Sequence, residues 1–318
     1  MRFMKEFNRF AGKWMPLLIL GCLCVGIAFS GPIGKLTFLV PFLFAFMTFT
    51  GTLNSTFRQL LNIAKDPLPL FVSLLIIHAV MPLLALGTGD LLFPGQTDFI
   101  SGLVLEFVVP SAVTSFMWCS IAGGNAALTL SIVLFDTLTA PFLVPFSLKF
   151  LVGARVSVDV PGMMRELLWM IALPALATML LNQFTDGRAG KNLSPILAPY
   201  GKLALIAIVM INSTAVAPFL RHMTPVLFGV AGMVFLISVT GYFLGGFSSR
   251  FFRRSDGVAA SMAFGCGMRN ISAGAVIAGA YFPAGVMFPV MIGTLFQQVL
   301  ASLVARIFLH RRPAAAEK

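Results

Sequence analysis

Four ionisable side chains stand inside long apolar stretches of this chain, where a free charge is unfavourable: His78, Glu106, Asp136 and Arg269. Imidazole and carboxyl groups can bind and release a proton, whereas a guanidinium keeps its charge and needs an anion beside it. If the stretches cross a membrane as helices, all four residues fall at a similar depth near its middle. A charge there costs at least ~2.5 kcal/mol unless it faces a partner or a cavity. These residues therefore indicate a buried site for an anion or a proton.

The composition places this site in a membrane protein. Of the 318 residues, 58% are hydrophobic and only 10% are charged, and the mean hydropathy is +0.95. The net charge of +11 comes from Lys and Arg in short connections between apolar stretches, which indicates orientation in a lipid bilayer and argues against nucleic-acid binding. The four cysteines are too scattered for a disulfide framework or a metal site, and no cofactor is expected.

Ten membrane-spanning helices are predicted from the apolar stretches, each about 20 residues long. Of the 22 Lys and Arg residues, 16 fall in connections on one side and five on the other, and Arg269 is left inside the membrane. The positive-inside rule then predicts a multi-pass protein of the plasma (inner) membrane with both termini in the cytoplasm. The basic start and the apolar run to Ser30 also resemble a signal peptide, but its removal would leave an odd number of spans. The predicted spans are 14–30, 34–51, 67–87, 98–120, 124–148, 163–183, 201–219, 224–248, 257–281 and 285–308.

Two of the predicted spans are interrupted at corresponding positions in the two halves of the chain. The fourth carries Pro110, which removes a backbone hydrogen bond, and the ninth carries Gly265, Gly267 and Asn270. Each half holds five spans, an odd number, so the halves would form inverted repeats. Broken helices at matched positions of inverted repeats mark the midplane binding site of secondary transporters. The alternative is that Pro and Gly only kink these helices or let neighbours approach.

The segments around these breaks resemble the bile acid:sodium symporter family. Residues 110–145 match the family's Pro-broken fourth helix, Gly-Asn turn and fifth helix ending in Ala-Pro, and GCGMRN at 265–270 stands where the family has Glu-x-Gly-x-Gln-Asn. The resemblance implies an all-α membrane fold of ten helices in two inverted five-helix repeats, residues 1–155 and 156–318, with broken helices 4 and 9 crossing. It also implies a core domain of helices 3–5 and 8–10, a panel of helices 1–2 and 6–7, and transport of organic anions, commonly driven by two sodium ions.

This chain departs from the family at the positions that surround sodium. Ser115 and Thr129 keep hydroxyl groups at the first sodium site, but Gly265 stands in place of the family's Glu and Arg269 in place of its Gln. Sodium is a hard cation that needs several oxygen ligands, and the carboxylate among them is gone. A guanidinium would also repel a second cation. Sodium coupling is therefore not expected.

We expect Arg269 to pair with Asp136, or with both Asp136 and Glu106, in place of the ions. The substrate would be a small organic anion held at the helix breaks by side chains and by the N-termini of the half-helices. The candidate proton carriers are Glu106 and His78, and proton-coupled transport and uncoupled exchange both stay open. The break residues are Pro110 and Gly265, and the candidate substrate-binding residues are Arg269, Asn270, Ser115, Thr114, Thr129 and Gly267.

Three alternatives stay open beside this hypothesis. A buried pair of Arg and a carboxylate can lock a fold without a role in transport. A sodium-coupled symporter of bile-acid type would keep the family's driving ion, and a non-transporting membrane sensor would keep only its scaffold. An enzyme is not expected, because the sequence holds no His-Glu-x-x-His motif and only three His. The sequence indicates neither the oligomeric state nor the identity of the anion.

Overall fold

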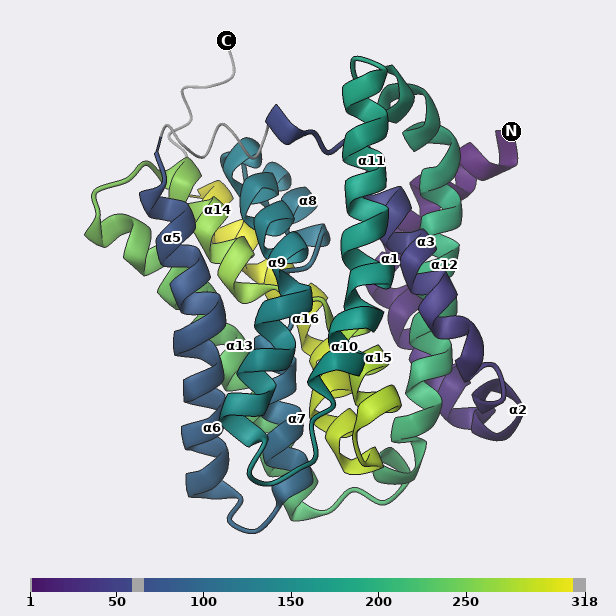
Figure 1. The fold of residues 1–318 in the computed structure, drawn as a ribbon, viewed down its shortest axis with the longest axis vertical. Coiled ribbons are helices and arrows are strands. Elements are labelled where there is room, and N and C mark those ends of the chain that lie inside the picture. The colour runs from purple at the N-terminus through teal and green to yellow at the C-terminus, as the bar shows by residue number, and fades with distance from the viewer. Residues whose placement is uncertain (1, 59–65, 311–318) are drawn as a thin grey trace.

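The computed structural model describes residues 2–58 and 66–310, and nearly all of them are helical (Figure 1). Within this part of the chain, six helical segments are long and apolar enough to cross a membrane. They coincide with the third, fifth, sixth, seventh, eighth and tenth predicted spans, and their bounds are Leu68–Leu92, Ala126–Val152, Val160–Phe184, Arg188–Arg221, Pro225–Phe251 and Ala284–Leu309. The start of the first helix and the end of the last lie at the same end of the molecule, the upper end in Figure 1.

Four of these segments are single helices: α9 (Ala126–Val152), α12 (Arg188–Arg221), α13 (Pro225–Phe251) and α16 (Ala284–His310). The other two each contain a π-helical turn. One consists of α5 (Leu68–Leu75), η3 (Ile76–Val80) and α6 (Met81–Leu92), and the other of α10 (Val160–Leu167), η4 (Leu168–Ala172) and α11 (Leu173–Phe184). At the first two predicted spans lie α1 (Arg2–Ala28) and α3 (Val40–Thr52), joined by the short helices α2 (Ser30–Gly34) and η1 (Thr37–Leu39).

A proline explains the π-helical turn that contains His78. Pro82 is the second residue of α6, directly after η3. It has no N–H to donate, and its ring would clash with the carbonyl group four residues earlier, which is that of His78. The helix therefore widens locally at His78, and such single π-turns are frequent at functional sites.

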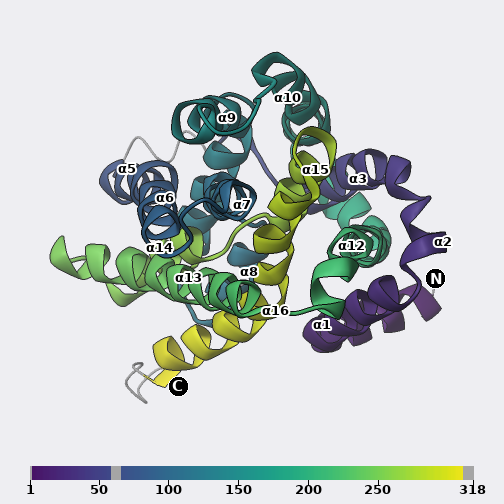
Figure 2. The same ribbon diagram turned by 90° about the horizontal axis from the view of Figure 1, so that it is seen from below.

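The helices form two groups that are visible when the molecule is seen along its length. Figure 2 shows α1, α3 and α12 on one side and α5, α6, α7 (Thr97–Val108), α13 and α14 (Asp256–Gly267) on the other. In the first group α12 packs against α1 and α3, and in the second α13 packs against α14 and α6 against α7. Helix α16 lies between the groups and packs against both α7 and α12.

The fourth and ninth predicted spans are each split into two half-helices, α7 and α8 (Thr114–Ile121), and α14 and α15 (Ile271–Tyr281). The unwound segments between them meet in an antiparallel bridge between Ser111 and Arg269. The N–H of Ala112 donates to the carbonyl of Met268 at 3.2 Å, and the N–H of Asn270 donates to that of Pro110 at 2.7 Å. In a bilayer, backbone groups outside helices must find partners within the protein. Each break supplies one such partner to the other.

The position of the second break differs from the prediction. Gly265 lies inside α14, which ends at Gly267, and the unwound residues are Met268 to Asn270. Pro110 lies in the first unwound segment, after Val109 in the extended conformation that a residue before proline prefers. Gly265 contributes to the crossing through its carbonyl group, which accepts a hydrogen bond from the hydroxyl of Ser111.

Candidate functional site

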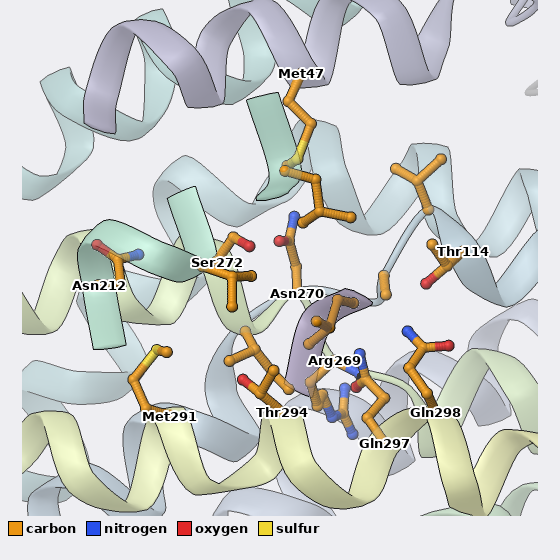
Figure 3. A pocket seen from close by; sticks show the side chains of 16 residues that line it. Met47, Thr114, Asn212, Arg269, Asn270, Ser272, Met291, Thr294, Gln297 and Gln298 are labelled. Atoms are coloured by element: carbon orange, nitrogen blue, oxygen red, sulfur yellow. Dashed lines mark hydrogen bonds between the residues drawn. The ribbon is translucent and has the colours of Figure 1, made fainter. Parts of the chain in front are cut away.

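A cavity lies where the crossing faces α1, α3, α12 and α16 (Figure 3). About 120 Å³ of it is open to the centres of water molecules, several times the ~10–15 Å³ that one water needs. Polar side chains from the crossing and from the facing helices therefore surround a space large enough for a small solute. Those that line it are Thr114, Asn212, Arg269, Asn270, Ser272, Thr294, Gln297 and Gln298.

Two half-helices begin at this cavity. Helix α8 starts at Thr114 and α15 starts at Ile271, and both residues line the space. The first N–H groups of a helix have no partner within it, and together with the aligned peptide dipoles they make its N-terminus a site for negative charge. Asn270 caps α15, since its side-chain oxygen accepts from the N–H of Ala273 at 3.3 Å. The backbone thus favours an anion in the cavity.

Arg269 borders the cavity, but it is only 2% exposed. The guanidinium Nη2 donates to the carbonyl of Cys266 at 3.1 Å, at the C-terminal end of α14, where the helix dipole is negative. The guanidinium atoms Nε and Nη1 have no hydrogen-bond partner among the described residues. The backbone N–H of Arg269 donates to Oε1 of Gln297 at 2.8 Å (Figure 3). A permanent positive charge is therefore buried at the crossing.

Asp136 does not pair directly with Arg269, contrary to our expectation. Its Oδ1 lies 2.8 Å from Nε2 of His78, and its Oδ2 accepts the backbone N–H of Ser111 at 2.7 Å. Both carboxylate oxygens are thus occupied by groups other than the guanidinium. Asp136 is fully buried, and its carboxylate binds the backbone N–H of Ser111 at the crossing without a hydrogen bond to the guanidinium.

Glu106 also forms no hydrogen bond with Arg269 in the described part of the chain. Its Oε1 lies so close to Gly293 of α16 that a Cβ on this glycine would overlap it. Its Oε2 has no hydrogen-bond partner among the described residues, although Glu106 is only 2% exposed. The expected triad is therefore not formed through hydrogen bonds, and Glu106 packs against α16.

Three of the expected substrate-binding residues do not line the cavity. The hydroxyl of Ser115 donates to the carbonyl of Ala112, and that of Thr129 donates to Sγ of Cys119 at 2.9 Å and to the carbonyl of Asn125 at 3.3 Å. Gly267 lies against Tyr242, so closely that a Cβ on the glycine would overlap the aromatic ring. These residues stabilise the packing of the half-helices. Arg269, Asn270 and Thr114 do line the cavity.

Sequence reasoning missed three uncharged amides of the cavity, Asn212, Gln297 and Gln298, because it considered mainly ionisable groups and the residues at the breaks. Gln297 and Gln298 are adjacent polar residues in an apolar stretch, and this pattern could have indicated them. Gln298 accepts from the indole N–H of Trp118 at 3.0 Å, which joins α16 to α8. Asn212 of α12 lines this cavity and also a second one, which is bordered by Glu166 of α10.

Comparison with known proteins identifies the family of the chain. The pattern of the Sodium Bile acid symporter family matches residues 41–220, more than half of the chain. The chain is 42% identical to the Bacillus subtilis protein "Uncharacterized protein YbaS" over 91% of its own length and 94% of the relative's. It is 27% identical to "Probable sodium/metabolite cotransporter BASS1, chloroplastic" of Arabidopsis thaliana, covering 82% of this chain and 64% of the relative. It is 20% identical to the "Uncharacterized sodium-dependent transporter YocS" of Bacillus subtilis, over 96% and 94% of the two chains. The chain belongs to the sodium bile acid symporter family, a family of membrane transporters and not of enzymes.

Proposed function

We propose that the protein is a secondary transporter that carries a small organic anion by alternating access, without sodium as the driving ion. The observation that carries this proposal is the division of charge at the crossing. The positive ends of α8 and α15 line the cavity, and the guanidinium of Arg269 is buried at the negative end of α14. The starts of α8 and α15 therefore favour an anion in the cavity, and the guanidinium of Arg269 already provides a positive charge at the end of α14.

The side chains at the expected sodium positions support the absence of sodium. Gly265 offers only its carbonyl oxygen, which accepts from Ser111. Ser115 and Thr129 offer only neutral hydroxyls, which donate to neighbouring groups of the protein and add no negative charge. Hard cations need several oxygen ligands, preferably with a carboxylate among them. Arg269 adds a repulsive charge of the same sign at this place.

We propose further that the helices form two inverted five-helix repeats, residues 1–155 and 156–318, with a core domain and a panel. The meeting of the two unwound segments in one antiparallel bridge supports this, as does the separation of α1, α3 and α12 from the helices around α7 and α14 (Figure 2). Asn212 lines two cavities at the boundary between the groups. Movement of the crossing past α12 would expose the anion alternately through these cavities.

Sodium-coupled symport is the second candidate, because the BASS1 and YocS relatives, among others, carry sodium in their names. Purified protein in proteoliposomes distinguishes the two candidates. A thermal-shift screen of small carboxylates and sulfonates selects the anion, and its uptake is measured in sodium chloride and in choline chloride. We expect saturable uptake at equal rates in both salts. A steep dependence of uptake on sodium would overturn the sodium-independent mechanism. If no anion shows saturable uptake, the proposed transport is wrong and the non-transporting sensor is the alternative that stays.

A further inference from the structure

His78 and Asp136 form a buried pair that the anion cavity does not use. Nε2 of His78 lies 2.8 Å from Oδ1 of Asp136, and the side chains are 11% and 0% exposed. Neither residue lines the cavity. The widened turn before Pro82 presents the imidazole to α9, where Asp136 lies. The pair is therefore a separate polar site within the membrane-spanning part.

The imidazole of this pair has one nitrogen that is free to take up a proton. A carboxylate accepts hydrogen bonds and does not donate them, so the neutral imidazole gives its one N–H, at Nε2, to Asp136. Nδ1 then carries a lone pair, and it has no partner among the described residues. Binding of a proton at Nδ1 turns the neutral hydrogen bond into an ion pair with Asp136, which compensates the new charge.

This pair is joined directly to the crossing. The second carboxylate oxygen of Asp136 accepts the backbone N–H of Ser111 at 2.7 Å, and Ser111 forms the bridge with Arg269. Ser111 also donates its hydroxyl to the carbonyl of Gly265. A change of charge at His78 therefore acts, through Asp136 alone, on the unwound segment around Ser111 that borders the cavity.

The remaining titratable groups around His78 come from the helices packed against η3. These helices are α5, α6, α7 and α13. Their titratable groups nearest to the middle of the membrane-spanning part, where His78 lies, are Glu106 on α7 and Tyr242 on α13. Asp90 lies 12 residues further along the same span, about 18 Å away along the helix axis. Cys266 lies in the last turn of α14, which packs against α5, and Arg269 lies in the unwound segment that follows. Within the described residues, the imidazole forms an ion pair with Asp136 alone.

We propose that His78, held by Asp136, is the site that binds the coupling proton. One proton adds to Nδ1 when a monovalent anion occupies the cavity, crosses with it, and leaves from the same nitrogen on the other side, so that symport is electroneutral. This inference rests on the proposed anion transport and names its driving ion.

Isethionate is a suitable probe, because a sulfonate stays ionised and does not leak through lipid as a neutral acid; L-lactate serves as the carboxylate. Proteoliposomes with the full chain receive an inward proton gradient of about one unit of pH, with a pH dye inside. We expect the wild type to accumulate the probe up to about tenfold, which is the limit for one proton per anion. The dye should report acidification that depends on the probe.

The variants His78→Gln and Asp136→Asn should lose accumulation and acidification but keep exchange of labelled for unlabelled probe. Retained exchange shows that they are folded. His222→Gln is the matched control, because His222 is exposed at the end of α12, and it should behave as the wild type. Accumulation by His78→Gln at the wild-type level, or net uptake of the probe without acidification in the wild type, would overturn this inference alone. Absence of any probe flux would overturn the proposed function as well.

Discussion

The backbone N–H of Arg269 donates to Oε1 of Gln297 at 2.8 Å, so one side chain of α16 fixes the residue at the centre of the crossing. Gln297→Leu leaves that N–H without a partner within the protein, and we expect it to lower stability by about 1–3 kcal/mol. Gln297→Glu keeps the acceptor but adds a negative charge beside the cavity. We expect it to retain the wild-type melting temperature and to weaken anion binding. Thermal unfolding and binding titrations in detergent separate the two effects, and equal stability of Gln297→Leu and wild type would contradict this role.

Gly267 is required for close packing against Tyr242. A Cβ at this position would overlap the aromatic ring, and both residues are buried. We expect Gly267→Ala to destabilise the protein by about 1–3 kcal/mol through overpacking. Tyr242→Ala in the same chain should remove the clash and recover part of this loss, although it leaves a cavity. Gly232→Ala is the control, since its added Cβ would meet no atom within 4 Å, and it should melt with the wild type. A Gly267→Ala protein as stable as this control would refute the assignment.

We expect the positive charge of Arg269 to attract the anion and to increase its affinity. Arg269→Gln removes it, and we expect a ten- to hundredfold loss of anion affinity, equivalent to about 1.4–2.8 kcal/mol. Arg269→Lys keeps the charge but not the planar group that donates to Cys266, so the loss should be smaller. Uptake at a series of anion concentrations measures both. If Arg269→Gln melts earlier but binds the anion with unchanged affinity, the charge serves only the fold.

Asp90 and Arg155 form an ion pair near one end of the molecule, with Nη2 of Arg155 2.7 Å from Oδ2 of Asp90. Their side chains are 42% and 30% exposed, so water and salt screen the interaction. Asp90→Asn should therefore change stability by less than about 1 kcal/mol, and less still at high salt. Uptake should be unaffected. A large loss of transport would show that this end of the molecule takes part in gating.

The broad architecture could be predicted from the sequence, because it depends on properties of consecutive residues, such as the length of an apolar stretch or the position of a proline. The lengths of the apolar stretches predicted the six long helices, and Pro110 marked the first break. Thr114, Arg269 and Asn270 lie on the cavity because they adjoin the breaks themselves.

The rotation of each helix about its axis could not be predicted. Helix α9 is apolar on nearly all faces, so nothing in its sequence indicated that Asp136 points to His78 and not to Arg269. Ser115 and Thr129 were expected at the substrate, yet the hydroxyl of Ser115 turns toward the start of its own helix and that of Thr129 toward Cys119 of α8. The second break lies three residues beyond Gly265 because Asn270 caps α15 and thereby sets where that half-helix starts. Such effects depend on contacts between helices and on local capping geometry.

In the proposed mechanism, part of the attraction for an anion comes from peptide groups at the starts of α8 and α15, and peptide groups are present whatever side chains the chain carries. The proposed preference for negative charge is therefore less sensitive to mutation of the uncharged residues of the cavity wall than the size and shape of the anion are. Substitutions at Asn212, Thr294 or Gln298 can exchange one anion for another while the preference for negative charge persists. In the proposed mechanism, the choice among anions therefore depends on these uncharged wall residues, and the preference for negative charge depends on the backbone and Arg269.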